Sequence, residues 1–317
     1  MKLLVQPEHG ISPIVTAIKK AKRQIEIVIF RADLNEVQKA LEAAVARGVP
    51  VHALIAHTNR GGEKRLRKLE QSLLEKGVTV SRTGDDLVRY HGKMLIVDRR
   101  ALHALGFNYT HLDVFKSRSF GLLTGRKRLV AEAVKVFEAD TTRQPYEPGH
   151  DAFVVSPENA RPVLSAFLKG ARKQLLIYDP KIADGPMTRL LLERAKAGVE
   201  IRVIGKFARK HPGILVDQLP KLRLHVRAIL RDGRDLFVGS QSLRQLELDR
   251  RREIGVIVRD PTVIREFRTI FEADWSTTAE AARQAEGARK ADKAADKQAE
   301  GEAGKDEADH EPAVASK

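Results

Sequence analysis

A histidine, a lysine and an aspartate with short, regular spacing could together perform chemistry on a phosphate group. His91, Lys93 and Asp98 form the pattern H-x-K-x4-D at the start of an apolar run. Alternate residues of a strand share one face, so His91 and Lys93 can contact the same phosphate. A neutral imidazole is a nucleophile and an ammonium binds phosphate oxygens, which favours attack at phosphorus. For a single occurrence, a partly exposed strand is an equally good explanation.

The pattern occurs a second time, in the other half of the chain. His225, Arg227 and Asp232 occupy the matching positions, and Ser240 and Ser242 lie shortly after them. Two imidazoles at equivalent places in two homologous units can face each other across a pseudo-twofold interface. Such a pair supplies a nucleophile and a general acid. The duplication therefore makes chemistry at phosphorus the better explanation.

The elements that must position these residues are also duplicated. Four pairs of segments match, the first two at an offset of 150 and the last two at 134: 21–30 with 171–180, 40–55 with 190–205, 90–98 with 224–232, and 119–124 with 253–258. Each copy runs helix, apolar strand, helix, apolar strand, a variable connection and a strand pair. Short apolar runs beside helical periods are typical of α/β units whose strands are buried on both faces. We therefore expect an α/β fold.

The domain limits follow from composition. Two prolines and a glycine in segment 142–151 mark a linker, so we expect one lobe over residues 1–145 and a second over 150–276. Residues 277–317 are rich in Ala, Lys, Glu and Asp, without an apolar stripe, which predicts a disordered tail.

The amino-acid composition limits both the class of protein and the kinds of partner that it can bind. The 317 residues include no cysteine, which excludes disulfide scaffolds, thiolate metal sites and cysteine nucleophiles. Residues 1–276 hold 50 basic and 32 acidic side chains, a net charge of about +18 that attracts nucleic acid, anionic membranes or anionic small molecules. No eighteen apolar residues run together, and the first apolar run is too short for a signal peptide. We expect a soluble, cytoplasmic chain with at most peripheral membrane contact.

A basic helix offers a second place for anions. It is expected after Gly61 and Gly62 and carries Lys64, Arg65, Arg67 and Lys68. A helix start with paired glycines can bind phosphate, and the basic face could meet lipid headgroups or a nucleic-acid backbone. Such a face is more often merely solvated.

The repeated H-x-K-x4-D motif resembles that of the phospholipase D superfamily. Each copy is followed by a G-S-x-N-like segment and then by a strand of the R-E-I-G-V type, and residues 3–30 are similar to the start of cardiolipin-synthase-like members. The resemblance implies two α/β/α sandwich lobes with mixed, largely parallel sheets, related by a pseudo-twofold axis. It also implies a cleft between the lobes and a two-step reaction through a phosphohistidine, without metal or cofactor.

Each copy departs from the family pattern at different positions. In the first copy, Leu105 and Gly106 replace Gly-Ser, and Ser119 replaces the glutamate that family members have 28 residues after the motif histidine. In the second copy Gly239, Ser240 and Glu253 are present, but Arg227 replaces lysine and Ser242 replaces asparagine. Both histidines are retained.

The resemblance and the chemistry together give each residue an expected role. His91 is the expected nucleophile and His225 the leaving-group acid, although the reverse order stays open. Glu253 is expected to orient His225, whereas His91 would rely on Ser119, a main-chain carbonyl or water. Lys93 and Arg227 would bind the nonbridging phosphate oxygens.

The remaining site residues would support the phosphate. Asn108, Ser240 and Ser242 are expected to bind the substrate, with Asn108 and Ser242 donating hydrogen bonds to the phosphate. Asp98 and Asp232 are counted with the catalytic motif, but a structural role for them is favoured over proton transfer.

These roles predict a phosphodiesterase or phosphatidyltransferase that acts on anionic phospholipid. Water as the acceptor would give hydrolysis, and an alcohol such as a glycerol headgroup would give transfer. Two alternatives are a metal-independent nuclease of the same superfamily and a phosphate-binding protein without turnover. We expect a monomer rather than an obligate dimer.

Overall fold

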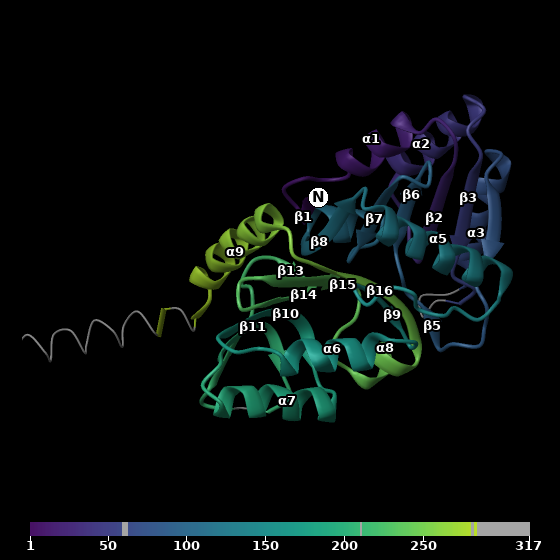
Figure 1. Ribbon diagram of the computed structural model, residues 1–317. Coiled ribbons are helices and arrows are strands. Elements are labelled where there is room, and N and C mark those ends of the chain that lie inside the picture. Colours follow the sequence, from purple (N-terminus) through teal and green to yellow (C-terminus); the bar gives the residue numbers. More distant parts are fainter. Residues whose placement is uncertain (59–62, 210, 280–281, 284–317) are drawn as a thin grey trace, which may run out of the picture.

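The computed structural model describes residues 1–58, 63–209, 211–279 and 282–283 (Figure 1). The predicted disordered tail lies almost entirely outside these residues, as do Gly61 and Gly62 before the basic helix. Within them, the chain forms two mixed sheets flanked by helices, which confirms the α/β prediction.

The first sheet is built mainly from the first half of the chain. Its strands run in the order β1-β8-β7-β6-β2-β3-β4, with bounds β1 (Lys2–Gln6), β2 (Ile25–Ile29), β3 (Val51–Ile55), β4 (Thr79–Arg82), β6 (Met94–Val97), β7 (Ala101–Leu105) and β8 (Ser117–Thr124). The helices of this half are α1 (Ser12–Lys20), α2 (Asn35–Ala46), α3 (Glu63–Glu75), α4 (His111–Phe115) and α5 (Lys127–Thr142).

The second sheet repeats this arrangement. Its strands are β12-β11-β10-β14-β15-β16 in order, with β9 also on β16: β9 (Phe153–Ser156), β10 (Gln174–Ile182), β11 (Glu200–Phe207), β12 (Ile214–Asp217), β14 (Arg227–Arg231), β15 (Asp235–Gly239) and β16 (Arg251–Val258). The accompanying helices are α6 (Ala160–Lys169), α7 (Gly185–Lys196), α8 (Gln245–Asp249) and α9 (Pro261–Ser276).

Both sheets are mixed, as predicted, but antiparallel strand pairs outnumber parallel ones, which corrects the expectation of largely parallel sheets. In the first sheet β2 pairs parallel with β3, and β3 with β4, whereas β1, β8, β7, β6 and β2 pair antiparallel in succession. Parallel pairs need a crossover helix, and α2 and α3 supply them, whereas a short turn joins β6 to β7 as an antiparallel hairpin.

Two very short strands cross between the sheets. β5 (Arg89–Tyr90) comes from the first half of the chain but pairs with β16 of the second sheet. Its counterpart, β13 (Arg223–Leu224), comes from the second half and pairs with β8 of the first sheet. Each of these strands lies directly before a motif histidine. The exchange therefore carries His91 and His225 to the sheet of the opposite lobe.

A shared apolar core holds the two sheets together. Helices α1 and α2 pack on the first sheet, and α6 and α7 on the second, whereas α5 and α9 contribute to a cluster that includes strands of both sheets (Figure 1). In this cluster the ring of Phe120 from β8 lies 5.4 Å from that of Tyr178 on β10 and 5.4 Å from that of Phe267 on α9. The strands that carry the two motifs are thus fixed relative to each other.

Candidate active site

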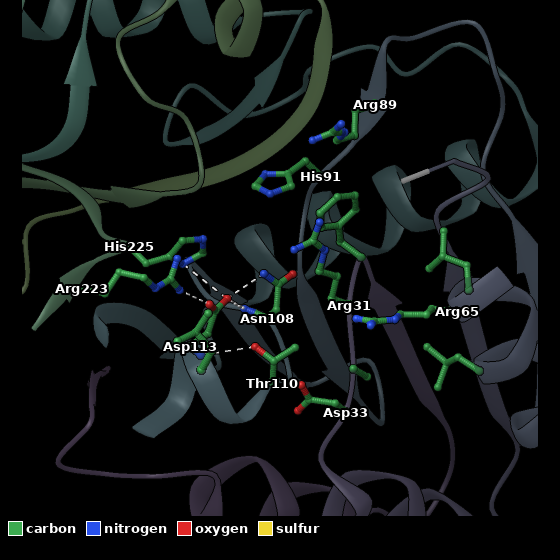
Figure 2. A pocket seen from close by; sticks show the side chains of 15 residues that line it. Arg31, Asp33, Arg65, Arg89, His91, Asn108, Thr110, Asp113, Arg223 and His225 are labelled. Atoms are coloured by element: carbon green, nitrogen blue, oxygen red, sulfur yellow. Dashed lines mark hydrogen bonds and ion pairs between the residues drawn. The ribbon is translucent and has the colours of Figure 1, made fainter. Parts of the chain in front are cut away.

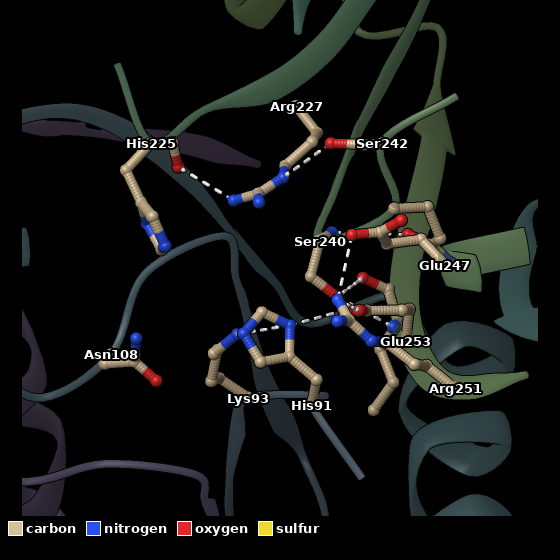
Figure 3. Close-up of polar contacts among 12 residues, drawn as sticks. His91, Lys93, Asn108, His225, Arg227, Ser240, Ser242, Glu247, Arg251 and Glu253 are labelled. Carbon is tan, nitrogen blue, oxygen red and sulfur yellow. Dashed lines mark hydrogen bonds and ion pairs between the residues drawn. The ribbon is translucent and has the colours of Figure 1, made fainter. Parts of the chain in front are cut away.

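His91 forms a buried pair with Glu253 from the other half of the chain. Its Nδ1 lies 2.9 Å from Oε2 of Glu253, whose side chain is fully buried (Figure 3). A carboxylate only accepts, so the Nδ1–H donates and the lone pair is left on Nε2. This arrangement fixes the tautomer of a nucleophilic imidazole.

The expectation that Glu253 orients His225 is therefore wrong. Because β5 adds to β16, the main-chain N–H of His91 donates to the carbonyl of Arg252 at 2.7 Å, next to Glu253. By the equivalent exchange, the N–H of His225 donates to the carbonyl of Arg118 at 3.1 Å, next to Ser119. Ser119 thus faces His225, and its Oγ donates to the main-chain oxygen of His225 at 3.3 Å.

The acidic neighbour of His225 is Asp113, which was not predicted from the sequence. The Nδ1 of His225 lies 3.5 Å from Asp113 Oδ2. Asp113 also forms an ion pair with Arg223 and accepts hydrogen bonds from the main-chain and side-chain amides of Asn108, at 2.8 and 2.7 Å (Figure 2). The sequence does contain one signal for Asp113. Asp113 and Glu247 are both acidic and lie 134 residues apart, the same offset that separates the two motif histidines.

Two cations approach the histidines. The Nζ of Lys93 lies 3.0 Å from both ring nitrogens of His91, and Lys93 is fully buried. Burial lowers the pKa of Lys93 to about 7. On the other side, the Nε of Arg227 donates to Ser242 at 3.2 Å and its Nη1 to the carbonyl of His225 at 3.4 Å (Figure 3).

Both histidines are neutral at pH 7 in the free protein. Burial, and then the charges of Lys93 and Arg227, lower the pKa of His91 well below its ordinary value. The pKa of His225 falls in the same direction for the same causes, with Arg227 ahead of Lys93. Neutral imidazole is the form that can act as a nucleophile.

The other predicted binding residues have partners within the protein. Ser240 exchanges two hydrogen bonds with the main chain of Ile254, at 3.1 and 3.3 Å, next to Glu253. The hydroxyl of Ser242 accepts from Arg227, and the side-chain amide of Asn108 donates to Asp113. The amide that was expected to donate to a phosphate is thus engaged by a carboxylate.

Asp98 and Asp232 lie at the far ends of the motif strands. Each has a positive φ, of 55° and 52°, in the turn that follows β6 or β14. The Asp98 carboxylate accepts from the main-chain N–H groups of residues 22–24, and Asp232 does the same for residues 172–174. The structure does not bring these aspartates to the histidines, and their contacts are those of a turn and loop support.

A cavity of about 460 Å³ connects the two histidines. His91, His225, Asn108 and Asp113 line it, together with arginines and an apolar wall that includes Phe30 (Figure 2). The ring of Phe30 meets that of His91 edge-on, with centroids 4.5 Å apart. A phosphorus atom placed here would have two imidazoles and several guanidinium groups as neighbours, and groups of these types can support a displacement at phosphate.

Two absences hold for residues 1–58, 63–209, 211–279 and 282–283. No helix there has the length and apolar character needed to cross a bilayer. In the same ranges, no three His, Asp or Glu side chains gather as ligands for a metal ion.

Solved structures with a similar fold were found by comparison. A polyphosphate kinase from Porphyromonas gingivalis is 21% identical with a TM-score of 0.71, over 86% of this chain and 50% of that one, so the chain spans half of the kinase's length. A phosphatidylserine synthase from Haemophilus influenzae Rd KW20 is 10% identical with a TM-score of 0.68, over 87% and 86% of the two chains. At these identities the likeness is one of fold.

Sequence comparison gives a more specific relation. No curated protein matches the chain. A family model described as cardiolipin synthase, PLD-like domain, matches residues 14–141 and 164–275, which include both motif histidines. With that match over most of its length, and with the duplicated fold and paired histidines described above, the chain belongs to the phospholipase D-like family of cardiolipin synthase domains.

Proposed function

We propose that the protein is a phosphodiesterase or phosphatidyltransferase that acts on anionic phospholipid through a phosphohistidine on His91. Family membership supports phosphoryl transfer in general. The observation that carries the specific proposal is the buried contact of 2.9 Å between His91 Nδ1 and Glu253, in a cavity that His225 also lines.

In the first step, the lone pair on His91 Nε2 attacks phosphorus. The P–N bond forms as the bond to the leaving alcohol oxygen breaks, and His225 donates a proton to that oxygen. Although His225 is neutral in the free protein, an anionic diester beside it raises its pKa and favours the protonated form. Glu253 stabilises the positive charge that develops on His91.

In the second step, water or an alcohol attacks the phosphohistidine. The P–N bond breaks, its electron pair returns to Nε2, and His225 takes the proton of the attacking oxygen. Lys93 and Arg227 stabilise the negative charge on the nonbridging oxygens in both steps. The hydrogen bond from Arg227 to the Ser242 hydroxyl orients the guanidinium group, which supports the proposed role of Arg227 as the second cation.

A nuclease is the second candidate, because the net charge of about +18 on residues 1–276 suits any polyanion. A binding protein without turnover is less well supported. The departures from the motif leave one complete histidine–carboxylate pair, since Glu253 serves the histidine of the first copy.

One assay separates these functions. Purified protein would be incubated, with EDTA present, with vesicles of phosphatidylglycerol or cardiolipin and with single- and double-stranded nucleic acid. We expect turnover of lipid alone, and no turnover by a His91→Ala variant. Turnover of nucleic acid alone would replace the proposal by the nuclease, and binding without turnover would replace it by the third function. Loss of activity on chelation would contradict the metal-free reaction.

A further inference from the structure

A second cavity, of about 670 Å³, lies at the end of the first sheet that is remote from the histidines. Arg99 and Arg100, in the turn between β6 and β7, line it together with Gly125, which follows β8, and with the start of α5. His91 precedes β6 whereas this turn follows it, so the length of the strand separates the cavity from the reacting groups. The volume falls within the range of about 300–1,000 Å³ that is usual for small-molecule sites.

One wall of this cavity is apolar. Val130, Ala131 and Val134 of α5 form it. Val130 is only 2% exposed, and Val134 packs against the shared core, so this part of the wall is fixed. Ala131 is exposed, so the wall is accessible from solvent. A hydrocarbon chain that lies along such a wall removes apolar surface from water on both sides.

The rest of the lining is cationic. Arg99, Arg100 and Lys127 contribute three positive charges, and no carboxylate lines the cavity. The guanidinium group of Arg99 is already paired, at 2.6 Å with Glu26 and at 2.7 Å with Glu138. Arg100 and Lys127 are exposed and, within the part of the chain that the structure describes, form no ion pair with a carboxylate. These two cations favour an anion as the ligand.

The conformation of Arg99 supports this reading of the charges. Its φ of 50° lies in the left-handed region that favours glycine, and the residue at the equivalent place in the second copy is Gly233, with a φ of 65°. An unfavourable backbone conformation is kept only where the side chain has a role. Here the side chain neutralises the two glutamates beside the cavity, which leaves the charges of Arg100 and Lys127 uncompensated.

The second copy also shows that the fold does not require this cavity. At the offset of 134, Arg268 of α9 corresponds to Val134 of α5. The guanidinium group of Arg268 lies over Gly233, where an added Cβ would collide with its Nη2. An arginine thus fills the equivalent space in the second lobe, whereas the shorter valine of the first copy leaves it open.

We infer that this cavity is a binding site for a single-chain amphiphile whose head group is a carboxylate or a phosphate. The head group contacts Arg100 and Lys127, and the chain lies along Val130, Ala131 and Val134. The guanidinium fork of Arg100 matches two oxygens of either head group. The site makes no contact with the histidines, so this inference and the proposed function stand or fall separately.

Binding of defined amphiphiles tests the ligand class. Isothermal titration of the full chain would compare octyl phosphate, octanoate, inorganic phosphate and octanol, each below the concentration at which micelles form. We expect at least one octyl anion to bind about tenfold or more tightly than either inorganic phosphate or octanol, because only the octyl anions combine the charge with the chain. The tighter octyl anion identifies the head group. Affinity no better than that of inorganic phosphate would remove the apolar wall from the site, and affinity no better than that of octanol would remove the cations.

The duplication supplies a matched pair of variants. Arg100→Gln removes a cation of the cavity, and Arg234→Gln removes its exposed counterpart at the offset of 134, which does not line the cavity. We expect Arg100→Gln to weaken binding of the tighter octyl anion about tenfold and Arg234→Gln to leave it unchanged. Equal effects would show a general charge effect and overturn the site. Ala131→Phe places a ring in the cavity and should weaken the octyl anion but not inorganic phosphate; equal losses for both ligands would contradict a bound chain.

Hydrogen exchange locates the bound ligand, because the cavity beside the histidines is also cationic. Peptide mass spectrometry would follow residues 98–101 and 125–134, with residues 232–235 and 259–268 of the second copy as the control. We expect the octyl anion to slow exchange in the first two segments only. Slowing confined to peptides around His91 would place the anion in the other cavity and overturn the inference. Arg100-dependent binding to phosphatidylglycerol vesicles, without binding of either octyl anion, would assign this surface to a bilayer and overturn it as well.

Discussion

At the scale of single residues, the proposed chemistry depends on which side chain each histidine contacts across the two halves of the chain. Glu253 follows His225 in the second copy, yet it contacts His91, and Ser119 of the first copy stands beside His225. The loss of a glutamate at position 119 therefore weakens the support of His225 and leaves that of His91 intact. This asymmetry favours His91 as the nucleophile. A nucleophilic imidazole needs a fixed tautomer, whereas a general acid depends less on a carboxylate partner.

The role of Glu253 can be measured directly. Replacing Glu253 by Gln keeps the shape of the side chain but removes the charge that stabilises His91 during attack. We expect kcat to fall about 100-fold or more, with little change in KM. Ser119→Ala, the control at the equivalent position, should change kcat little, because the Ser119 hydroxyl contacts only a main-chain oxygen. A larger loss in Ser119→Ala than in Glu253→Gln would reverse the assignment of the two histidines.

Lys93 should set the pH dependence of substrate binding. Its pKa of about 7 means that the free protein holds a charged Lys93 below pH 7 and loses that charge as the pH rises. We expect the affinity for a phosphodiester, measured by equilibrium binding, to fall as the pH rises above about 7, because the charged form of Lys93 is lost. Lys93→Arg should lack this alkaline loss of affinity, and a loss that persists in the variant would remove Lys93 as its cause.

At the scale of elements, two buried arginines anchor the strands that receive the exchanged segments. Arg252 of β16 pairs with Asp140 at 2.9 Å and donates to the carbonyl of Ser156 at 3.1 Å. Arg118 of β8 repeats this geometry with Asp274 at 2.7 Å and the carbonyl of Gln6 at 2.9 Å. The arginine of each lobe thus binds a helix, α5 or α9, and the strand beside it.

Removing one anchor should destabilise the fold strongly. Arg252→Met leaves the buried Asp140 carboxylate without its cation, which costs about 3–5 kcal/mol in the free energy of unfolding. Arg259→Met, the matched control, breaks an ion pair between Asp235 and an arginine that is 76% exposed, and should cost less than about 1 kcal/mol. Urea denaturation measures both. Equal losses would mean that the buried cluster is no more important than a surface pair.

The sequence predicts the elements better than their pairing. The two copies, their apolar strands and the helices between them follow from periodicity and from the offsets of 150 and 134. The pairing of β5 with β16 does not, because a two-residue strand such as Arg89–Tyr90 has no hydrophobic period and its partner lies far away in the chain. The partner of His91 depends on that pairing, so the sequence alone places Glu253 beside His225 and leaves His91 without a carboxylate. The expectation of largely parallel sheets was wrong for a related reason, because tight turns such as that at Asp98 produce antiparallel hairpins.

At the scale of the whole molecule, the two lobes share one core. Phe120 from the first half packs against Tyr178 and Phe267 from the second, and Trp275 lies in the same cluster. The lobe limits of 1–145 and 150–276 stay a proposal about sequence units, because this core does not divide along them. A site made from both halves of the chain requires a shared core that fixes the two halves relative to each other.

The shared core predicts cooperative unfolding. Trp275, the single tryptophan of the chain, is buried in the central cluster and reports on it by fluorescence. We expect its transition in urea to coincide with the transition of both lobes seen by far-UV circular dichroism. Two separate transitions in the dichroism, only one of them matched by fluorescence, would show that the lobes unfold independently.

The central claim is that His91, held by Glu253, attacks phosphorus with His225 on the opposite side. Quenching the protein in base during turnover of a phospholipid preserves an N-phosphorylated histidine, and peptide mass spectrometry locates it. We predict an adduct on His91 in the parent protein and its loss in Glu253→Gln. An adduct on His225 would exchange the two roles, and an adduct on neither histidine during turnover would contradict covalent catalysis at this site.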